Sequence, residues 1–324
     1  MTPSDEPVLR VEGLTKIFRS SGRRAVSVLA ASEVTFSLSK GEVLALVGES
    51  GSGKTTIGRM ITGVEVPTAG RVSIPPKPGV NPRQRVQMVF QDPYAAVNPF
   101  NRIEYTLMRP LINFRHMSAQ DARRTAGEIL QTVQLTPPEE YLNKRPHQLS
   151  GGQRQRIVIA RALAAQPEIM VADEPIAMLD VSIRADILHL LRDLLDQGHV
   201  SAMVYITHDI LTARILANRI MVLYRGHVVE TGDMETILVN PRHPYTQLLW
   251  ASIPNPRRAA RGESVQVLQE RPGVGTDGCP FAPRCPLVQD LCTVKKPRLV
   301  TMEDGRDVSC HVVAPTSEEA AAGA

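Results

Sequence analysis

Eight residues near the start of the chain have the types and spacing needed to hold a chain of phosphates. They run from Gly48 to Thr55 with the sequence GESGSGKT and fit the pattern G-x-x-x-x-G-K-[ST]. Glycines let such a loop turn its backbone N–H groups toward phosphate oxygens. The lysine ammonium would reach the outer phosphates, and the Thr55 hydroxyl would face Mg²⁺. We therefore predict that nucleotide phosphates contact Gly48, Ser50, Gly51, Gly53, Lys54, Thr55 and Thr56.

The residues on either side of this loop predict a strand and a helix. Residues 43–47 are a short apolar run typical of a buried strand, and residues 56–62 predict the start of a helix. The helix N-terminus would add partial positive charge beside the loop. A flexible Gly/Ser loop without function is the alternative, and the flanking pattern argues against it.

Two acidic residues follow another predicted strand, at the edge where parallel α/β sheets bind ligands. The apolar run 169–172 is followed by Asp173 and Glu174. Asp173 is suited to hold Mg²⁺, and Glu174 is placed to orient or deprotonate a water molecule. A solvated strand end is the alternative. The phosphate-binding loop in the same chain favours the catalytic interpretation.

Two further predicted strands end in polar side chains that could act beside a phosphate. Residues 85–90 are followed by Gln91, and residues 203–207 are followed by His208. A histidine at the carboxyl end of a strand, level with the two acids, is a candidate to contact a phosphate. A single histidine is more often structural, so its position alone supports this interpretation.

Two other features have both a functional and an ordinary explanation. The residues Ser150, Gly151, Gly152 and Gln153 precede a predicted helix and could bind phosphate at its N-terminus, or they could form a plain helix cap. Phe18 ends the β-rich run 8–18 and could stack on an adenine ring, or it could simply pack against its neighbours.

Composition restricts the class of protein only moderately. The 324 residues carry a net charge of +4 with a pI of about 9.0, which is compatible with nucleic acid or an anionic membrane surface and selects neither. Aromatic residues make up 4% of the chain, which argues weakly against single-strand stacking platforms. No apolar stretch approaches 18 residues, and the first seven residues do not resemble a signal peptide. We expect a cytosolic protein that would reach a membrane only by docking on another protein.

The order of the predicted elements indicates an α/β fold with an insertion and an extension. Residues 101–145 lack long β-runs, and Ser118 is placed as a helix N-cap, so this segment reads as a helical insertion. From Asn240 the composition shifts. We predict a core at 8–92 and 161–240, a helical subdomain at 93–160, an extension at 241–315 and a disordered tail at 316–324.

The motifs, taken in order, resemble the nucleotide-binding subunit of ABC transporters over residues 8–240. The resemblance rests on the phosphate loop, Gln91, the sequence LSGGQ from Leu149, the two acids, Asp180 and His208. It implies a RecA-like core with an antiparallel β subdomain and the cofactors ATP and Mg²⁺. It also implies that Ser150, Gly151 and Gly152 cover the ATP of a second cassette and that Asp180 lies in the contact between cassettes. The remaining implied roles are Glu174 as catalytic base, Gln91 on Mg²⁺ and the attacking water, His208 on the γ-phosphate, and Phe18 on adenine.

Four shorter stretches resemble the ATPases of dipeptide and oligopeptide importers, and the first of them resembles the second, F-type subunit of a pair. They are FQDPY from Phe90, RPH from Arg145, HPYT from His243 and CPFAPRCP from Cys279. The resemblance implies a heterodimeric ATPase, two transmembrane permease subunits, an extracytoplasmic peptide-binding protein and no nucleic acid, at the cytoplasmic face of the inner membrane. Nickel and glutathione importers share these features.

The sequence also departs from this family, and other classes of ABC protein remain as alternatives. Ile176 and Ala177 stand where the family commonly has Thr or Val and usually has Ser, yet Glu174, Asp180 and His208 are intact, so we predict a competent site. A soluble ABC ATPase of translation or DNA repair would carry tandem cassettes or long coiled coils, and this chain has neither. An exporter cassette would lack the peptide-importer extension.

The four cysteines all lie in the last part of the chain, at Cys279, Cys285, Cys292 and Cys310. Their spacing contains no C-x-x-C, so it does not indicate a zinc ribbon, and disulfides are not expected in the cytosol. An iron–sulfur cluster, another metal and no metal all remain open from the residues. The family resemblance implies a [4Fe–4S] cluster with a structural role.

Overall fold

A computed structural model describes residues 6–19, 27–252, 271 and 277–316. One mixed sheet runs through the molecule in the order β10 (Val300–Thr301), β11 (Asp307–Val308), β9 (His227–Asp233), β8 (Arg219–Tyr224), β3 (Val43–Val47), β7 (Ala202–Thr207), β6 (Ile169–Asp173) and β5 (Val86–Val89). Strands β8, β3, β7, β6 and β5 are parallel. A second, antiparallel sheet has the order β2 (Ser27–Leu38), β1 (Leu9–Arg19) and β4 (Ala69–Ser73).

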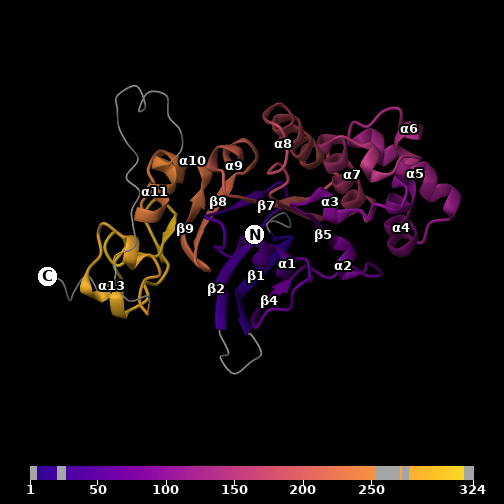
Figure 1. The fold of residues 1–324 in the computed structure, drawn as a ribbon. Helices are drawn as coiled ribbons and strands as arrows, with labels where there is room; N and C mark the ends of the chain where they lie inside the picture. The colour runs from indigo at the N-terminus through magenta and orange to yellow at the C-terminus, as the bar shows by residue number, and fades with distance from the viewer. Residues whose placement is uncertain (1–5, 20–26, 253–270, 272–276, 317–324) are drawn as a thin grey trace.

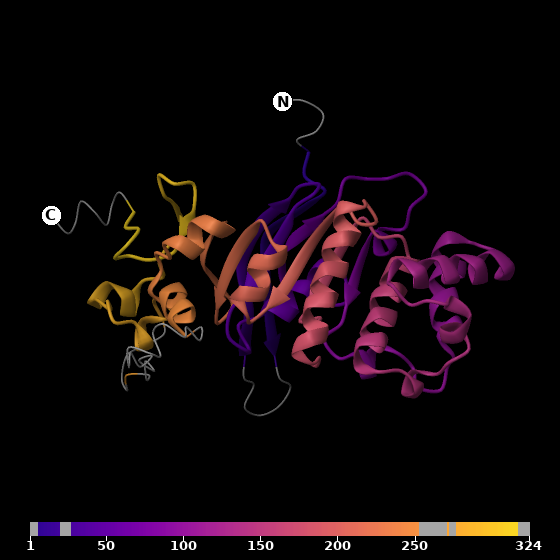
Figure 2. The ribbon, with the colours of Figure 1, turned by 90° about the horizontal axis from the view of Figure 1, so that it is seen from above.

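Helices lie on both faces and at both ends of the mixed sheet. They are α1 (Lys54–Ile61), α2 (Pro82–Arg85), α3 (Pro93–Ala96), α4 (Ile103–Arg115), α5 (Ala119–Thr132), α6 (Pro138–Leu142), η1 (Pro146–Gln148), α7 (Gly151–Ala164), α8 (Val181–Asp196), α9 (Ile210–Leu216), α10 (Met234–Val239), α11 (Pro244–Ala251), η2 (Ala282–Arg284) and α13 (Asp290–Val294). Figure 1 shows α8 and α9 over one face of the mixed sheet and the antiparallel sheet beneath the other. Figure 2 shows the helices α4–α7 at one end and the C-terminal extension at the opposite end.

The central strands are apolar along their whole length because both faces are covered. All five residues of β3 are buried. Successive side chains of a strand point to opposite faces, and here Val43, Ala45 and Val47 pack with α7, α8 and α9. Leu44 and Leu46 pack with α1 and the antiparallel sheet. The predicted buried strands at 43–47, 169–172 and 203–207 are therefore confirmed, as is the α/β fold with a helical insertion.

One strand is not apparent from the sequence. Residues 67–70 have the turn-forming sequence PTAG, yet β4 begins within it and runs from Ala69 to Ser73 as an edge strand paired with β1. Its side chains are mostly exposed, so they carry no apolar pattern that could reveal it. Helix α7 runs from Gly151 to Ala164 and includes residue 160, and the predicted domain boundaries stay predictions. Residues 317–324 of the predicted tail lie outside the described residues.

The C-terminal extension continues the mixed sheet of the core. Strand β11 pairs with β9, with Val308 opposite Glu230. The Glu230 carboxylate is fully buried and forms an ion pair of 3.2 Å with Arg306, whose side chain is 2% exposed. The same carboxylate accepts hydrogen bonds from the backbone N–H groups of Arg242 and His243 at 2.9 and 3.0 Å. A buried charge is tolerated only when it is paired in this way. No helix among the described residues is long and apolar enough to cross a membrane.

Stability should depend on pH through His243, which is 1% exposed. Its Nδ1 atom accepts a hydrogen bond of 3.0 Å from the Tyr245 N–H, and burial lowers its pKa from 6.5 to about 3. The unfolded chain therefore takes up the proton more readily than the folded one. We expect the contribution of neutral His243 to the free energy of unfolding to be fully present above pH 6.5. It should decline between pH 6.5 and pH 3, by at most about 1.4 kcal/mol per pH unit.

Urea unfolding of the full chain at several pH values would measure this decline. His243→Asn retains an acceptor for the Tyr245 N–H, so we expect folding at pH 7 with a shallower decline below pH 6.5. His199→Gln changes an exposed histidine and should leave the decline as in the wild type. An unchanged slope in His243→Asn would show that this histidine does not control the pH response.

Candidate active site

The phosphate loop connects the end of β3 to the start of α1, as predicted. Gly53 has a φ of 99°, and a Cβ atom there would lie 1.9 Å from the Ala30 carbonyl oxygen. Only glycine fits such a position, because a side chain would meet both backbone strain and a clash. Strand β2 of the antiparallel sheet, which contains Ala30, therefore packs directly against the loop and restricts its backbone conformation.

Lys54 is held by the loop that precedes it. Its Nζ atom donates to the carbonyl oxygens of Gly48 and Glu49 at 2.8 and 2.9 Å and to Ser52 Oγ at 3.3 Å. Burial lowers the pKa of this amine, while the nearby carboxylates of Glu174, Asp173 and Glu49 act in the opposite direction. Among the residues that the structure describes, this buried ammonium contacts neutral oxygens and has no direct anionic partner. Phosphate oxygens would supply one.

The two predicted acids lie at the end of β6, beside the loop. The Thr55 hydroxyl donates to Asp173 Oδ1 at 3.0 Å. Burial raises the pKa of Asp173, and the hydrogen bond from Thr55 opposes this shift. Thr55 and Asp173 together offer the oxygen ligands that Mg²⁺ prefers. When bound there, Mg²⁺ would neutralise phosphate charge.

The Glu174 carboxylate contacts two other polar side chains of the site, Gln91 and His208. The φ of 43° at Glu174 lies in the left-handed region, which is uncommon for a residue with a side chain. Its Oε2 atom accepts a hydrogen bond of 3.1 Å from Gln91 Nε2 and lies 3.4 Å from His208 Nδ1. The Glu174 side chain is 16% exposed, so water can reach it. A carboxylate in this setting can accept a proton from a water molecule.

These side chains line one cavity of about 670 Å³. Its lining comprises Val28, Leu29, Ala30, Gly48, Glu49, Ser50, Gly51, Gly53, Lys54, Thr55, Thr56, Gln91, Glu174, His208 and Leu249. The polar residues lie at the strand ends, and the apolar ones come from β2 and α11. A cavity with one cationic, amide-rich end and one apolar end fits a nucleoside phosphate, so the residues present fit ATP with Mg²⁺.

The adenine end of this cavity differs from what the sequence suggested. Phe18 is 41% exposed and is not among the lining residues. It pairs in register with Val28, which does line the cavity. Stacking by Phe18 therefore stays a prediction. Sequence reasoning missed Leu249, because it lies about two hundred residues from the phosphate loop and belongs to no recognised motif.

The second glycine-rich element lies outside this cavity. Ser150 caps α7, since its Oγ accepts from the Gln153 N–H at 3.2 Å while Gln153 Oε1 accepts from the Ser150 N–H at 3.0 Å. A Cβ atom on Gly152 would lie 2.7 Å from the Ile183 side chain of α8, so this glycine allows two helices to approach closely. Asp180 precedes α8 and is not part of the cavity either. The predicted contacts of these residues with ATP remain predictions.

The four cysteines are buried free thiols in the extension. Cys279 and Cys292 are joined by a backbone hydrogen bond of 2.8 Å. Burial raises the thiol pKa of Cys279 and of Cys285 to about 11, so both are protonated at neutral pH. Among the described residues, no group of three or more Cys, His, Asp or Glu is placed to hold a metal ion. The described residues therefore give no support to the expected iron–sulfur cluster.

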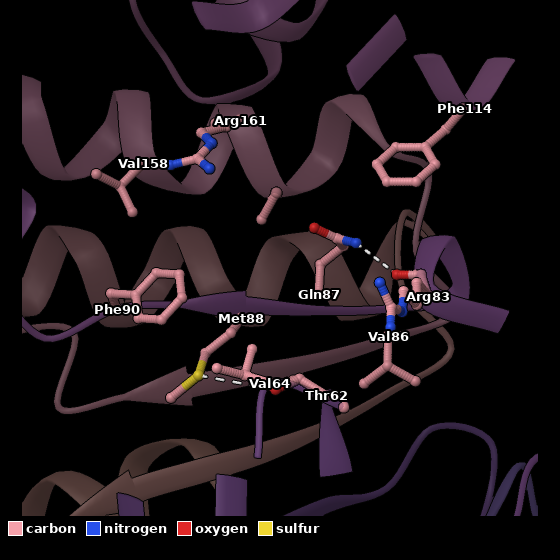
Figure 3. A pocket seen from close by; sticks show the side chains of 12 residues that line it. Thr62, Val64, Arg83, Val86, Gln87, Met88, Phe90, Phe114, Val158 and Arg161 are labelled. Atoms are coloured by element: carbon pink, nitrogen blue, oxygen red, sulfur yellow. Dashed lines mark hydrogen bonds between the residues drawn. The ribbon is translucent and has the colours of Figure 1, made fainter. Parts of the chain in front are cut away.

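A second hollow of about 320 Å³ is lined by residues of both the core and the helical insertion. Figure 3 shows Phe90 and Phe114 at its two ends, with Arg161 on the α7 side and Val64 on the opposite side. Burial lowers the pKa of the Arg161 guanidinium, which donates to the Ala96 carbonyl oxygen. Phe90 directly precedes Gln91, so this hollow adjoins the residue that contacts Glu174.

Comparison with known proteins agrees with this geometry. The family described as "ABC transporter" matches residues 31–177, and the family described as "Oligopeptide/dipeptide transporter, C-terminal region" matches residues 229–292. A Brucella abortus protein whose name describes a peptide import ATP-binding protein is 41% identical, over 95% of this chain and 94% of its own length. A Sinorhizobium fredii protein whose name describes a peptide ABC transporter ATP-binding protein is 38% identical, over 96% and 92%.

Solved structures show the same fold. The cassette MJ0796, described as a dimer in a post-hydrolysis state bound to ADP and Pi, superposes with a TM-score of 0.60 and 32% identity, over 70% of this chain and 98% of its own. The Clostridium perfringens cbiO1 structure reaches a TM-score of 0.63 at 24% identity, over 80% and 100%. The chain belongs to the ATP-binding proteins of the ABC transporter family and is an ATPase of that family.

Glu174→Gln should abolish turnover while leaving the site assembled. The glutamine can still accept the hydrogen bond from Gln91, but it cannot accept a proton from water. We expect ATP turnover of the assembled complex to fall about 100-fold or more, with nucleotide affinity close to that of the wild type. Glu128→Gln, on the exposed face of α5, is the control and should retain full turnover. Unchanged turnover in Glu174→Gln would mean that another group is the base.

Proposed function

We propose that this chain powers the uptake of dipeptides or oligopeptides. The observation that carries the proposal is the peptide-transporter C-terminal region at residues 229–292, joined to a cassette with an intact set of catalytic side chains. The names of the relatives point to the same class of solute. Importers of nickel or glutathione are the alternatives, since the solute would be selected by other subunits.

The reaction is hydrolysis of ATP to ADP and phosphate. The loop from Gly48 to Thr55 binds the phosphates and holds them in line with the attacking water. Glu174 accepts a proton from that water, while Gln91 and His208 keep the carboxylate oriented toward it. Bond making is left to the water and the phosphate, so the protein contributes chiefly position and charge.

We further propose that the site is completed by a second ATPase subunit, in a heterodimer. Support comes from the position of Ser150–Gly152 at the N-terminus of α7, outside the cavity of its own chain and with Ser150 exposed. A helix N-terminus attracts anions, so this element is suited to cover the phosphates bound by a partner. The cassette MJ0796 was solved as a dimer.

The remaining proposed partners are two membrane permeases and an extracytoplasmic peptide-binding protein, with the ATPase at the cytoplasmic face of the inner membrane. We propose that a helix of a permease occupies the hollow of Figure 3. Three observations support it: the aromatic rings at its two ends, the apolar Val64, which is 60% exposed, and the adjacency of Phe90 to Gln91. A permease helix bound there could move Gln91 and so change its hydrogen bond to Glu174.

Growth on peptides would test the transported solute. A host strain that lacks this gene and requires one amino acid should fail to grow when that amino acid is supplied only as a dipeptide or oligopeptide. The wild-type gene should restore growth, and Glu174→Gln should not. Normal growth of the deletion strain, together with loss of nickel or glutathione uptake, would assign the solute to an alternative class.

Purification in detergent would test the partners. We expect the wild-type chain to recover a second ATPase and two multi-span proteins. Val64→Glu places a charge in the hollow and should lower recovery of the multi-span proteins about tenfold while retaining the second ATPase. Val294→Glu alters another exposed valine, 73% exposed on α13, and should recover all three. Recovery of ribosomes or DNA instead would refute the transporter proposal.

A further inference from the structure

The C-terminal extension contacts the phosphate loop through an ion pair. Arg284 ends the short helix η2, directly before Cys285. Its two terminal nitrogens donate to the two carboxylate oxygens of Glu49, at 2.9 and 3.0 Å. Glu49 is the second residue of the phosphate loop, 235 positions away in the chain. Such two-pronged pairs fix geometry as well as charge, because a guanidinium matches the plane of a carboxylate.

A second residue of the extension holds the backbone of the same loop position. The Tyr245 hydroxyl accepts a hydrogen bond of 2.9 Å from the Glu49 N–H. Tyr245 is fully buried, and its ring lies 4.6 Å from that of Tyr224 and 5.4 Å from that of Phe281, measured between centroids. Burial raises the pKa of Tyr245, so the hydroxyl stays neutral at physiological pH.

Arg284 is itself oriented by this aromatic cluster. Its guanidinium lies 5.8 Å from the Tyr224 ring centroid and 5.9 Å from that of Phe281. Tyr224 belongs to β8 of the core, whereas Phe281 and Tyr245 belong to the extension. The cluster therefore joins the two parts of the chain at the place where they meet the loop.

The contacts of Arg284 and Tyr245 would act on the nucleotide through Glu49. The Glu49 carbonyl oxygen accepts a hydrogen bond from Lys54 Nζ, and Glu49 lines the cavity. Nearby, Gly51 has a φ of 79°, and a Cβ atom there would meet nothing within 4 Å. The tip of the loop thus faces open space, and the contacts at Glu49 hold the segment that precedes it.

We propose that Arg284 and Tyr245 are positioning residues for ATP binding, which fix the phosphate loop in its binding conformation before the nucleotide arrives. Leu249, one turn beyond Tyr245 on α11, adds an apolar wall to the same cavity. The extension is therefore part of the nucleotide site of its own chain. A pre-formed loop avoids the entropy cost of ordering it on binding. The proposal requires ATP at this cavity and is independent of which solute is imported.

Nucleotide titration of the isolated full chain would test the proposal. Arg284→Ala should raise the Kd for ATP roughly five- to tenfold, and Arg284→Lys should restore part of the affinity because a single charge replaces the fork. Tyr245→Phe leaves the charge unchanged and should raise the Kd roughly two- to fivefold, because the Glu49 N–H loses its acceptor. In the assembled complex, KM for ATP should rise in each variant while kcat stays within about twofold.

Two comparisons separate positioning of the loop from general stabilisation. Arg214 and Glu235 form a similar two-pronged pair, at 3.0 and 3.1 Å, that shares no residue with the cavity. Arg214→Ala should leave the Kd unchanged. In a Glu49→Gln background, Arg284→Ala should change the Kd less than twofold, since the pair is already weakened.

The proposal is overturned if Arg284→Ala and Tyr245→Phe bind ATP as tightly as the wild type. It is also overturned if Arg284→Ala weakens binding equally in the wild-type and Glu49→Gln backgrounds. If Arg284→Ala does not fold, the Glu49→Gln and Tyr245→Phe variants supply the test. Failure of the wild-type chain to bind ATP would instead reject the nucleotide site as a whole.

Discussion

The parallel pairing of the central strands is the constraint on which the active site depends. Strands β3, β7, β6 and β5 run in register, with Val47 opposite Thr207 and Ala172 opposite Val89. Their carboxyl ends meet at one edge, so four segments far apart in sequence deliver the phosphate loop, His208, Glu174 and Gln91 to one place. Both faces of the strands are buried, which makes a one-residue shift of register costly. The position of each polar side chain at this edge is thus fixed by burial of the strand that precedes it.

This constraint also explains how much could be predicted from the sequence. The strands are continuous apolar runs, and the polar residues follow them directly, so both the fold class and the edge at which Asp173 and Glu174 meet Lys54 could be inferred. The inference fails where pairing leaves no apolar pattern, as in β4, whose side chains are mostly exposed. It also fails for contacts set only by tertiary packing. Glu49 and Arg284 are charged residues in distant segments, and both would be expected at the surface. Neither their types nor their spacing indicates that they form an ion pair.

The extension is joined to the core by strand pairing and by a buried ion pair. Strand β11 pairs with β9, and the pair of Arg306 and Glu230 links the two parts. A buried ion pair of this kind gives modest net stability but strongly penalises any arrangement that separates its partners. The extension is consequently held in one position relative to β8 and β9. Arg284 and Tyr245 can hold the phosphate loop only if the extension has such a fixed position.

The site therefore receives constraints from two directions within one chain. The antiparallel sheet presses on Gly53 from the side of β2, where Ala30 leaves no room for a side chain. The extension holds Glu49 from the side of α11 and η2. A loop fixed at both its second and its sixth positions can keep its N–H groups aimed at phosphate without a ligand present, and this preorganisation favours binding. By contrast, Ser150 and Gly152 lie outside the cavity of their own chain. Binding of ATP can thus be prepared within one subunit, and the proposed second subunit would supply closure over the phosphates.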